Sequence, residues 1–309
     1  MKIAIIGTGG VGGYFGAKLA QAGFDVTFLA RGEHLKAIQK NGLQVKSILG
    51  DFHTDHLTAT DSIPKIGKSD LIILCVKAWQ IKEISTDLKS IIHDDSMVLP
   101  LQNGILASEE LKEAIDEKHI LGGLCRIISK IESPGTINHF GVDPIIVFGE
   151  LIETDAKRSQ ELKTLFTKAG IRSEISNDIT SDLWGKFLAI CVSGLLAITK
   201  TTHGEIMELK ETRQMMFDLL TEIYVLSQKV GVHLKSDIVD QTMAFIDSFP
   251  YESTTSLTRD VWQGRPSEIE YQNGTVVKFG EKYGVDTPIN KFVYHCILPM
   301  EIKARKPKP

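Results

Sequence analysis

Two periodicities of apolar residues alternate along the first half of the chain and predict strands and helices in turn. The apolar run Ile3 to Ile6 leads through a glycine turn into the amphipathic segment Tyr14 to Ala22, the order strand, turn, helix. Leu71 to Val76 is apolar on both faces, as expected of a central strand in a parallel sheet. Further strands are predicted at Phe24 to Ala30, Met97 to Leu101 and Ile171 to Ile175. The pattern indicates an α/β fold with a doubly wound sheet in the N-terminal half.

Extended segments continue from Ile120 to Gly149. Turn signals interrupt them at residues 133–135, which read Ser-Pro-Gly, and at Asp143-Pro144. We expect antiparallel strands here, added to the same sheet.

After Asn177 the apolar period becomes helical. Helices are expected at Asp178 to Ala197 as one long helix, Thr212 to Val230, Asp237 to Ser248, Ser267 to Tyr283 and Ile289 to Lys303. The second of these ends at Gly231, a typical residue after a helix C-terminus. We place the domain boundary near residue 176, giving domains 1–176 and 177–309.

Composition adds limits to this picture. The chain has 309 residues, 42% of them hydrophobic and 24% charged, which suits two ordinary globular domains. The formal net charge of −4 provides no basic field for nucleic acid. The basic cluster at residues 303–309 is expected to be a frayed, solubilising tail.

The sequence also favours a cytoplasmic protein. Its first residues already form a core strand, so no signal peptide is expected, and no apolar run reaches the roughly 18 residues of a membrane span. The apolar stretch Phe187 to Thr199 is interpreted as a buried helix. The cysteines lie in apolar contexts without metal-ligand spacing, so we expect buried reduced thiols and no metal: Cys75, Cys125, Cys191 and Cys296. The apolar helices of the second domain allow two interpretations, a homodimer interface or the core of a single chain.

The glycine turn has the G-x-G-x-x-G spacing that seats a dinucleotide pyrophosphate. Gly7 permits the tight turn, Gly9 lets the diphosphate approach the backbone, and Gly12 lets the helix pack close to the strand. The predicted contacts are Gly7, Thr8, Gly9, Gly10, Val11 and Gly12. The alternative is an ordinary glycine turn between a strand and a helix.

Arg31 directly follows the predicted strand that ends at Ala30. In a doubly wound fold this position lies beside the adenosine ribose, where an acidic residue favours NAD and a guanidinium holds a 2′-phosphate. We therefore predict NADP(H) as the cofactor. The alternative is that Arg31 is a solvated loop residue.

Two further polar positions follow buried strands. Lys77 comes after Leu71 to Val76, and the trio Gln102, Asn103 and Gly104 comes after Met97 to Leu101. Ligands bind at the carboxyl ends of strands in open α/β sheets. We therefore expect Lys77 and Asn103 to contact the cofactor, with the trio bordering the nicotinamide.

Several motifs occur in an order that resembles the ketopantoate reductase (2-dehydropantoate 2-reductase) family. They are GTGGVGGYFGAKLA, LAR, CVKAWQ, QNG, SPGTINHFG, DLWGK, TTSLTRD and SEIEYQNG, and they span nearly the whole chain. The resemblance implies a Rossmann domain followed by an all-helical domain like that of 6-phosphogluconate dehydrogenase. It also implies NADPH-dependent reduction of a 2-keto acid, in the type reaction 2-dehydropantoate to pantoate in pantothenate biosynthesis.

By position, the resemblance implies roles for five residues. Lys186 matches the catalytic lysine, and Asn103 matches the asparagine that contacts cofactor and substrate. Ser256 matches the serine on the substrate carboxylate, Glu268 the glutamate that supports the site, and Lys77 the lysine after its strand. The alternatives are a solvated helix lysine at 186, an Asn-Gly turn, a loop hydroxyl, and a first-turn acid at 268 capped by Ser267.

The chain departs from the family pattern after the lysine, where asparagines are usual four and eight residues on. Ile190 and Gly194 stand there, and helical geometry lets both face the substrate. Ser193 is expected to replace one polar contact as a substrate-binding residue. The alternatives are therefore a reductase of another branched 2-oxo acid and a non-catalytic NADP(H)-sensing protein.

Two histidines are interpreted as structural residues. His139 is expected to satisfy a strand neighbour, and His203 to be a surface histidine near a helix end.

Overall fold

The computed structural model describes residues 1–152 and 156–306, and the chain forms two compact units. The sheet unit comprises Met1–Gln102 and Leu106–Ile179; the helical unit comprises Asn103–Ile105 and the chain from Thr180 onward. The sequence placed one boundary near residue 176. The contacts place it after Ile179 and also assign the short segment that follows Gln102 to the helical unit.

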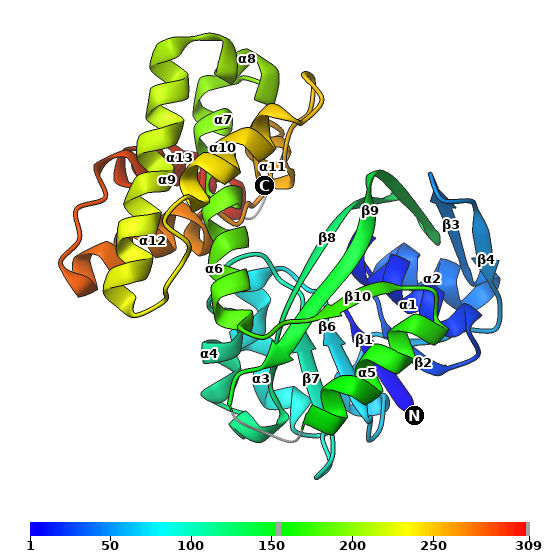
Figure 1. The fold of residues 1–309 in the computed structure, drawn as a ribbon. Helices are drawn as coiled ribbons and strands as arrows, with labels where there is room; N and C mark the ends of the chain where they lie inside the picture. The colour runs from blue at the N-terminus through cyan, green and yellow to red at the C-terminus, as the bar shows by residue number, and fades with distance from the viewer. Residues whose placement is uncertain (153–155, 307–309) are drawn as a thin grey trace. The chain divides into compact units, whose positions relative to one another are not determined.

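A parallel sheet forms the centre of the sheet unit, as predicted (Figure 1). Its strands lie in the order β5 (Thr58–Thr60), β2 (Asp25–Leu29), β1 (Lys2–Ile6), β6 (Leu71–Leu74) and β7 (Met97–Pro100). Alternate residues of β1 pack into the hydrophobic clusters on the two faces of the sheet. Ile3 and Ile5 pack on the side of α1 (Gly10–Gln21), whereas Ala4 and Ile6 pack on the side of α3 (Ile81–Leu88). Burial on both faces explains why the central strands β1, β6 and β7 are almost continuously apolar.

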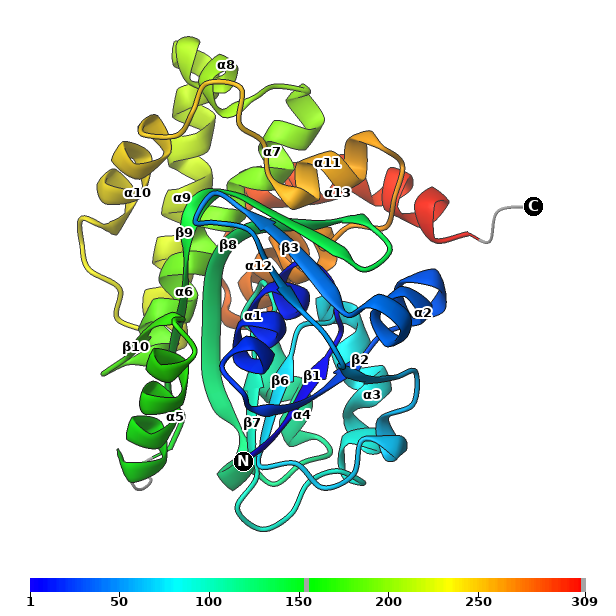
Figure 2. The same cartoon turned by 90° about the vertical axis from the view of Figure 1, so that its right-hand side faces the viewer.

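A second sheet differs from the prediction. The strands β8 (Leu121–Ser133) and β9 (Thr136–Glu150) do form an antiparallel hairpin around Pro134 and Gly135. They do not extend the first sheet, however. They join the order β10 (Arg172–Ile175), β9, β3 (Leu43–Ser47) and β4 (Phe52–Thr54), as Figure 2 shows for β8, β9 and β3.

The predicted turn at Asp143-Pro144 is also wrong. Arg126 pairs with Ile145 and Ile128 with Phe140, so the residues between lie in a bulge within one long β9 strand. Helix α1 contacts strands of both sheets and thus lies between them.

The remaining elements of the sheet unit cover these two sheets. They are α2 (Gly32–Asn41), η1 (Ile63–Lys65), η2 (Ala78–Gln80), α3, α4 (Ala107–Lys112), η3 (Glu117–His119) and α5 (Ala156–Lys168). Helix α5 packs on β9 and β10 through buried Leu162, Leu165 and Phe166.

The helical unit packs around its own apolar core (Figure 1). Its elements are α6 (Ile179–Ile190), α7 (Val192–Thr199), α8 (His203–Glu208), α9 (Lys210–Val230), α10 (Ile238–Asp247), α11 (Ser256–Trp262), η4 (Ile269–Tyr271), α12 (Asn273–Tyr283) and α13 (Pro288–Arg305). This confirms the α/β class with a helical C-terminal part. Helix α9 ends at Gly231 as expected.

Two predicted helices are interrupted. The helix expected from Asp178 has one turn residue at Cys191, which separates α6 from α7 but keeps a helical backbone (φ −64°, ψ −19°); the Cys191 carbonyl oxygen accepts a 3.1 Å hydrogen bond from the Asn273 amide. The helix expected from Ser267 breaks at Gln272, whose backbone is far from helical (φ −115°, ψ −107°). Ser267 is not a helix cap, since its N–H and hydroxyl both donate to Glu301 at 2.9 and 2.6 Å.

Surface expectations also need correction. Helix α13 continues to Arg305, so the start of the basic segment is helical, and residues 307–309 lie outside the described residues.

The cysteines are all free thiols, but not all are buried. Cys125 and Cys191 are buried and Cys75 is half-buried, whereas Cys296 is exposed. Among the described residues, the stretch Ile179–Thr199 alone is long and apolar enough to cross a membrane, and 56% of it is buried, as in a core helix.

Candidate functional site

The glycine turn leaves an open cradle at the start of α1. Gly7 has φ +99°, and a Cβ there would lie 2.7 Å from the backbone nitrogen of Val76. A Cβ on Gly12 would collide with the Gly7 carbonyl oxygen. Gly9, by contrast, has nothing within 4 Å of its Cβ position, and α1 has no side-chain cap. The turn is therefore tight on its inner side and open where a diphosphate would approach helix N–H groups.

The other residues of the turn hold it in place. The N–H and hydroxyl of Thr8 both donate to the Leu29 carbonyl oxygen, at 3.0 and 2.9 Å. A Cβ on Gly10 would lie 2.5 Å from the Ser129 carbonyl oxygen, and Val11 packs against the core. Thr8 thus fixes the turn with its side chain and has no free donor left for a ligand.

Arg31 is exposed at the carboxyl end of β2, immediately before α2. Its side chain forms no hydrogen bond or ion pair within residues 1–152 and 156–306. A free guanidinium at this edge fits the 2′-phosphate predicted from the sequence.

His34, one turn further along α2, is a residue that the sequence analysis missed. Its Nδ1 accepts a 3.0 Å hydrogen bond from the Gly135 N–H, which leaves the proton on Nε2. Nε2 is buried and, in the part of the chain described, has no hydrogen-bond partner. Burial lowers the pKa of His34, and the ring lies beside the backbone of Thr8. Because Nε2 is buried and faces the Thr8 backbone, His34 supports the glycine turn and offers no open donor to a ligand. The sequence feature that could have pointed to His34 is its position three residues after Arg31, on the same helix.

Lys77 and Gln102 follow β6 and β7 in the sheet unit. Lys77 is half-buried; its N–H donates to Gln80 Oε1 at 3.2 Å and its Nζ lies 5.7 Å from the centre of the Trp79 ring. Gln102 donates from Nε2 to the Val76 carbonyl oxygen at 3.1 Å. Lys77 is therefore held near the strand end predicted for the cofactor.

Asn103 and Glu268 lie together in the helical unit. Asn103 Nδ2 donates to Glu268 Oε2 at 3.3 Å, and Glu268 is 5% exposed. The next residue, Gly104, has φ +96°, and a Cβ there would lie 2.8 Å from the Tyr271 carbonyl oxygen. This close approach seats the segment after β7 against η4. Two residues 165 positions apart are thus brought into contact.

Lys186 lies on α6, next to residues of the helical core. It is half-buried, whereas Trp184 and Phe187 on either side are 4% and 1% exposed, with ring centres 5.7 Å apart. The core packing of these two neighbours fixes the part of α6 that carries Lys186.

Ser256 is aligned with this region by two hydrogen bonds between α11 and α7. Thr258 Oγ1 donates to the Ser193 carbonyl oxygen at 3.0 Å, and Trp262 Nε1 donates to that of Ala197 at 3.1 Å. Both pairs are 65 residues apart, so the helices run side by side in parallel. The same offset places Ser256 level with position 191, five residues after Lys186, or about 7.5 Å along a helix axis. Ser256 is exposed.

Gly194 does not face open space, contrary to expectation. A Cβ there would lie 2.5 Å from Asn273 Oδ1 and 2.6 Å from Val293 Cγ1, inside the helical core. Ile190 is half-buried, and Ser193 is 2% exposed. The glycine at position 194, in place of the usual family asparagine, is thus explained by core packing. The contact of Ser193 with substrate stays a prediction.

The two histidines behave differently. His139 is 1% exposed; its Nδ1 pairs with Ser47 Oγ at 2.8 Å and its Nε2 with the Val142 carbonyl oxygen at 2.9 Å, so the structural interpretation is confirmed. His203 is 5% exposed and pairs through Nδ1 with the Ser253 carbonyl oxygen at 2.9 Å. The expectation of a surface histidine is therefore wrong.

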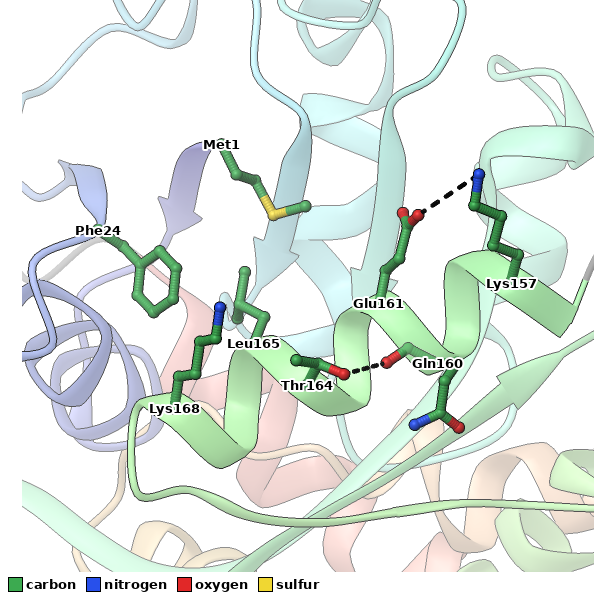
Figure 3. Close-up of a pocket in the computed structure, with 8 residues that line it drawn as sticks. All are labelled: Met1, Phe24, Lys157, Gln160, Glu161, Thr164, Leu165 and Lys168. Atoms are coloured by element: carbon green, nitrogen blue, oxygen red, sulfur yellow. Dashed lines mark hydrogen bonds and ion pairs between the residues drawn. The ribbon is translucent and has the colours of Figure 1, made fainter.

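The sheet unit also has a surface hollow of about 360 Å³, which none of these candidate residues lines (Figure 3). It is lined by Met1, Phe24, Lys157, Gln160, Glu161, Thr164, Leu165 and Lys168. Met1 and Phe24 precede β1 and β2, so the hollow is at the amino ends of the strands, opposite the glycine turn. Two of its polar groups are paired within the hollow: Lys157 with Glu161 at 4.0 Å, and the Thr164 hydroxyl with the Gln160 carbonyl oxygen at 2.9 Å. It offers no candidate chemistry. Within the described ranges, no group of three or more His, Cys, Asp or Glu could hold a metal ion.

Comparison with known proteins identifies relatives over almost the whole chain. The family model "Ketopantoate reductase PanE/ApbA" matches residues 3–153, and its C-terminal counterpart matches residues 178–301. The chain is 31% identical to the 2-dehydropantoate 2-reductase of Nostoc sp. over 95% of its length and 93% of that protein. It is 30% identical to the uncharacterized oxidoreductase YkpB of Bacillus subtilis, over 95% and 97% of the two chains.

Solved structures show the same architecture. A PanE/ApbA family ketopantoate reductase from Ralstonia eutropha superposes with a TM-score of 0.91 at 26% identity, over 99% of this chain and all of that one. A D-mandelate dehydrogenase solved with NADH and anilino(oxo)acetate superposes with a TM-score of 0.90 at 25% identity, over 98% and 99% of the chains.

Proposed function

The chain belongs to the ketopantoate reductase family, and we propose that it is a cytoplasmic enzyme that reduces a 2-keto acid to a 2-hydroxy acid with NADPH. The first candidate substrate is 2-dehydropantoate, which would place the enzyme in pantothenate biosynthesis. The observation that carries the proposal is the contact between Asn103 and Glu268 in the unit that also holds Lys186 and Ser256.

Residues of the sheet unit fit the cofactor. The open side of Gly9 suits the diphosphate end, and the free guanidinium of Arg31 suits a 2′-phosphate. When bound, the cofactor supplies the hydride. The D-mandelate dehydrogenase neighbour was solved with NADH, so the choice of NADPH needs its own test. We expect Arg31→Ala to weaken NADPH binding and leave NADH binding unchanged. Equal affinities of the wild type for NADPH and NADH would contradict the assignment.

The helical unit supplies the proton and the positioning. Negative charge develops on the ketone oxygen during reduction, and Lys186 would donate a proton to it, which typically contributes about 10²- to 10⁴-fold. The amide of Asn103 would polarise the same carbonyl. Glu268 holds that amide at 3.3 Å, and Ser256 would receive the carboxylate.

A second candidate substrate is a more apolar 2-keto acid. Ile190 replaces an amide that the family usually carries, and Asn273 fills the space at Gly194, so neither position offers a polar contact to substrate. The D-mandelate dehydrogenase neighbour has the same fold, and we draw the wider substrate class from that likeness.

The experiment is a screen of NADPH oxidation with 2-dehydropantoate and other branched 2-keto acids. A clear preference in kcat/KM for 2-dehydropantoate would favour the first candidate, and a preference for apolar acids the second. The absence of turnover with every acid, in a protein that binds NADPH, would leave a non-catalytic NADP(H) sensor and refute the proposed activity.

A further inference from the structure

We propose that Arg259, together with Ser256, forms the clamp that binds the substrate carboxylate. This rests on the proposed 2-keto acid reductase activity and adds a specificity-determining residue to it. The substrate class that follows is a 2-keto monocarboxylate held by a charged group at one end.

Arg259 is half-buried on α11. Its Nη1 donates to the carbonyl oxygen and to Oγ1 of Thr254, at 2.9 and 3.2 Å. Thr254 precedes the helix, so the guanidinium is folded back toward the start of α11. Ser256, the first residue of α11, lies at that same end and is exposed.

This guanidinium has no acidic partner within residues 1–152 and 156–306. Other arginines of the helical unit do: Arg265 pairs with Asp260 at 2.7 Å and Arg213 with Asp247 at 2.7 Å. The carboxylate next to Arg259 in sequence is thus already engaged with another arginine. A half-buried guanidinium without a carboxylate is unusual, because partial desolvation of a charge is costly unless the charge is paired.

The free side of the guanidinium has the right shape for a carboxylate. Nη1 is engaged by Thr254, and neither Nε nor Nη2 of Arg259 forms a hydrogen bond in the described chain. These two N–H groups are parallel and match the two oxygens of a carboxylate. Burial lowers the pKa of Arg259, but arginine keeps its charge throughout the working pH range.

The clamp also lies in a suitable place. Ser256 and Arg259 are three residues apart on one helix, so their Cβ atoms are about 5–6 Å apart. The register with α7 sets Ser256 level with Cys191, close along the axis to the helix that carries Lys186. A 2-keto acid has its ketone next to its carboxylate. The carboxylate can therefore bind to the clamp while the neighbouring ketone oxygen binds to Lys186.

The test compares Arg259→Gln and Arg259→Lys with the wild type. The probes are 2-oxoisovalerate and its methyl ester, which has the same ketone but no carboxylate charge. Calorimetry with the NADP⁺-loaded protein measures binding, and NADPH oxidation gives KM and kcat. Arg172→Gln removes an exposed arginine of the sheet unit and serves as the matched control.

For Arg259→Gln we expect the KM and Kd for the acid to rise about ten- to hundred-fold, with kcat little changed and the ester unaffected. Arg259→Lys should fall between, because lysine keeps the charge and loses the fork. Unchanged KM and Kd in folded Arg259 variants of an active enzyme would overturn the clamp and leave the reductase activity standing. If the wild type neither binds nor reduces the acid, the proposed function itself fails, and the clamp with it.

Discussion

Replacing Gly194 with alanine tests whether core packing explains why a glycine stands at a position where the family usually has asparagine. Position 194 lies in α7, and an added Cβ would stand 2.5 Å from Asn273 Oδ1 and 2.6 Å from Val293 Cγ1. Asn273 cannot move cheaply. It is fully buried, and its amide donates to the Cys191 carbonyl oxygen at 3.1 Å and to Asn290 Oδ1 at 2.9 Å.

The magnitude follows from three contributions. Alanine in place of glycine within a helix is favourable by about 1 kcal/mol. Displacing Asn273 costs two hydrogen bonds of about 0.5–1.5 kcal/mol each, and overpacking costs about 1–3 kcal/mol more. We therefore expect Gly194→Ala to lower the free energy of unfolding by about 1–5 kcal/mol. Gly194→Asn, which restores the usual family residue, should lower it further.

The assay is chemical denaturation with Gly185→Ala as the matched control. Gly185 lies on α6 with nothing within 4 Å of its Cβ position, so the same change should stabilise there by about 0.5–1 kcal/mol. In an Asn273→Ala background the cost at 194 should shrink by about 1 kcal/mol or more. Equal stabilisation by the alanines at 185 and 194 would refute the reasoning.

Three further predictions concern other positions. Gly104→Ala should lower both stability and kcat, because its φ of +96° and the Tyr271 carbonyl oxygen at 2.8 Å leave no room for a Cβ beside Asn103; unchanged kinetics would contradict this. Burial lowers the pKa of His203 below its ordinary 6.5, so the stability it contributes is present above about pH 6.5 and lost as the pH falls toward the folded-state pKa. Between pH 7.5 and 5, the free energy of unfolding of His203→Gln should thus depend less on pH than that of the wild type. A steeper dependence in the variant would contradict this prediction. In native protein a thiol reagent should label Cys296 rapidly, and Cys296→Ser should remove that fast phase; the control Cys191→Ser should not, because burial raises the pKa of Cys191 well above its ordinary value.

Much of the fold follows from local pattern. The strands β1, β6 and β7 of the parallel sheet are apolar on both faces, and the glycine turn has a characteristic spacing, so both could be predicted from short segments. The β8–β9 hairpin was predictable for the same reason, through Pro134 and Gly135. Its membership of a second sheet depends on pairing with β3, nearly a hundred residues earlier, and no local pattern reports that.

The site shows the same division. Lys186 and Asn103 were identified by motif, but their surroundings depend on long-range contacts. The Cys191 carbonyl oxygen accepts a hydrogen bond from an amide 82 residues away, and the same side chain fills the space at Gly194. Arg259 carried no signal in the sequence, because what distinguishes it is that no acidic group of the described residues pairs with it, which only the packed structure reveals.

Lys186→Ala tests the central claim, that the helical unit supplies the proton for reduction of a 2-keto acid. The measurement is single-turnover oxidation of bound NADPH by the best substrate of the screen, with NADPH affinity measured by fluorescence titration. Lys229→Ala, an exposed lysine on α9, is the control. The account predicts a loss of about 10²- to 10⁴-fold in the rate for Lys186→Ala, with unchanged NADPH affinity and no effect in the control. A Lys186→Ala enzyme that binds NADPH and reduces the acid at the wild-type rate would contradict it.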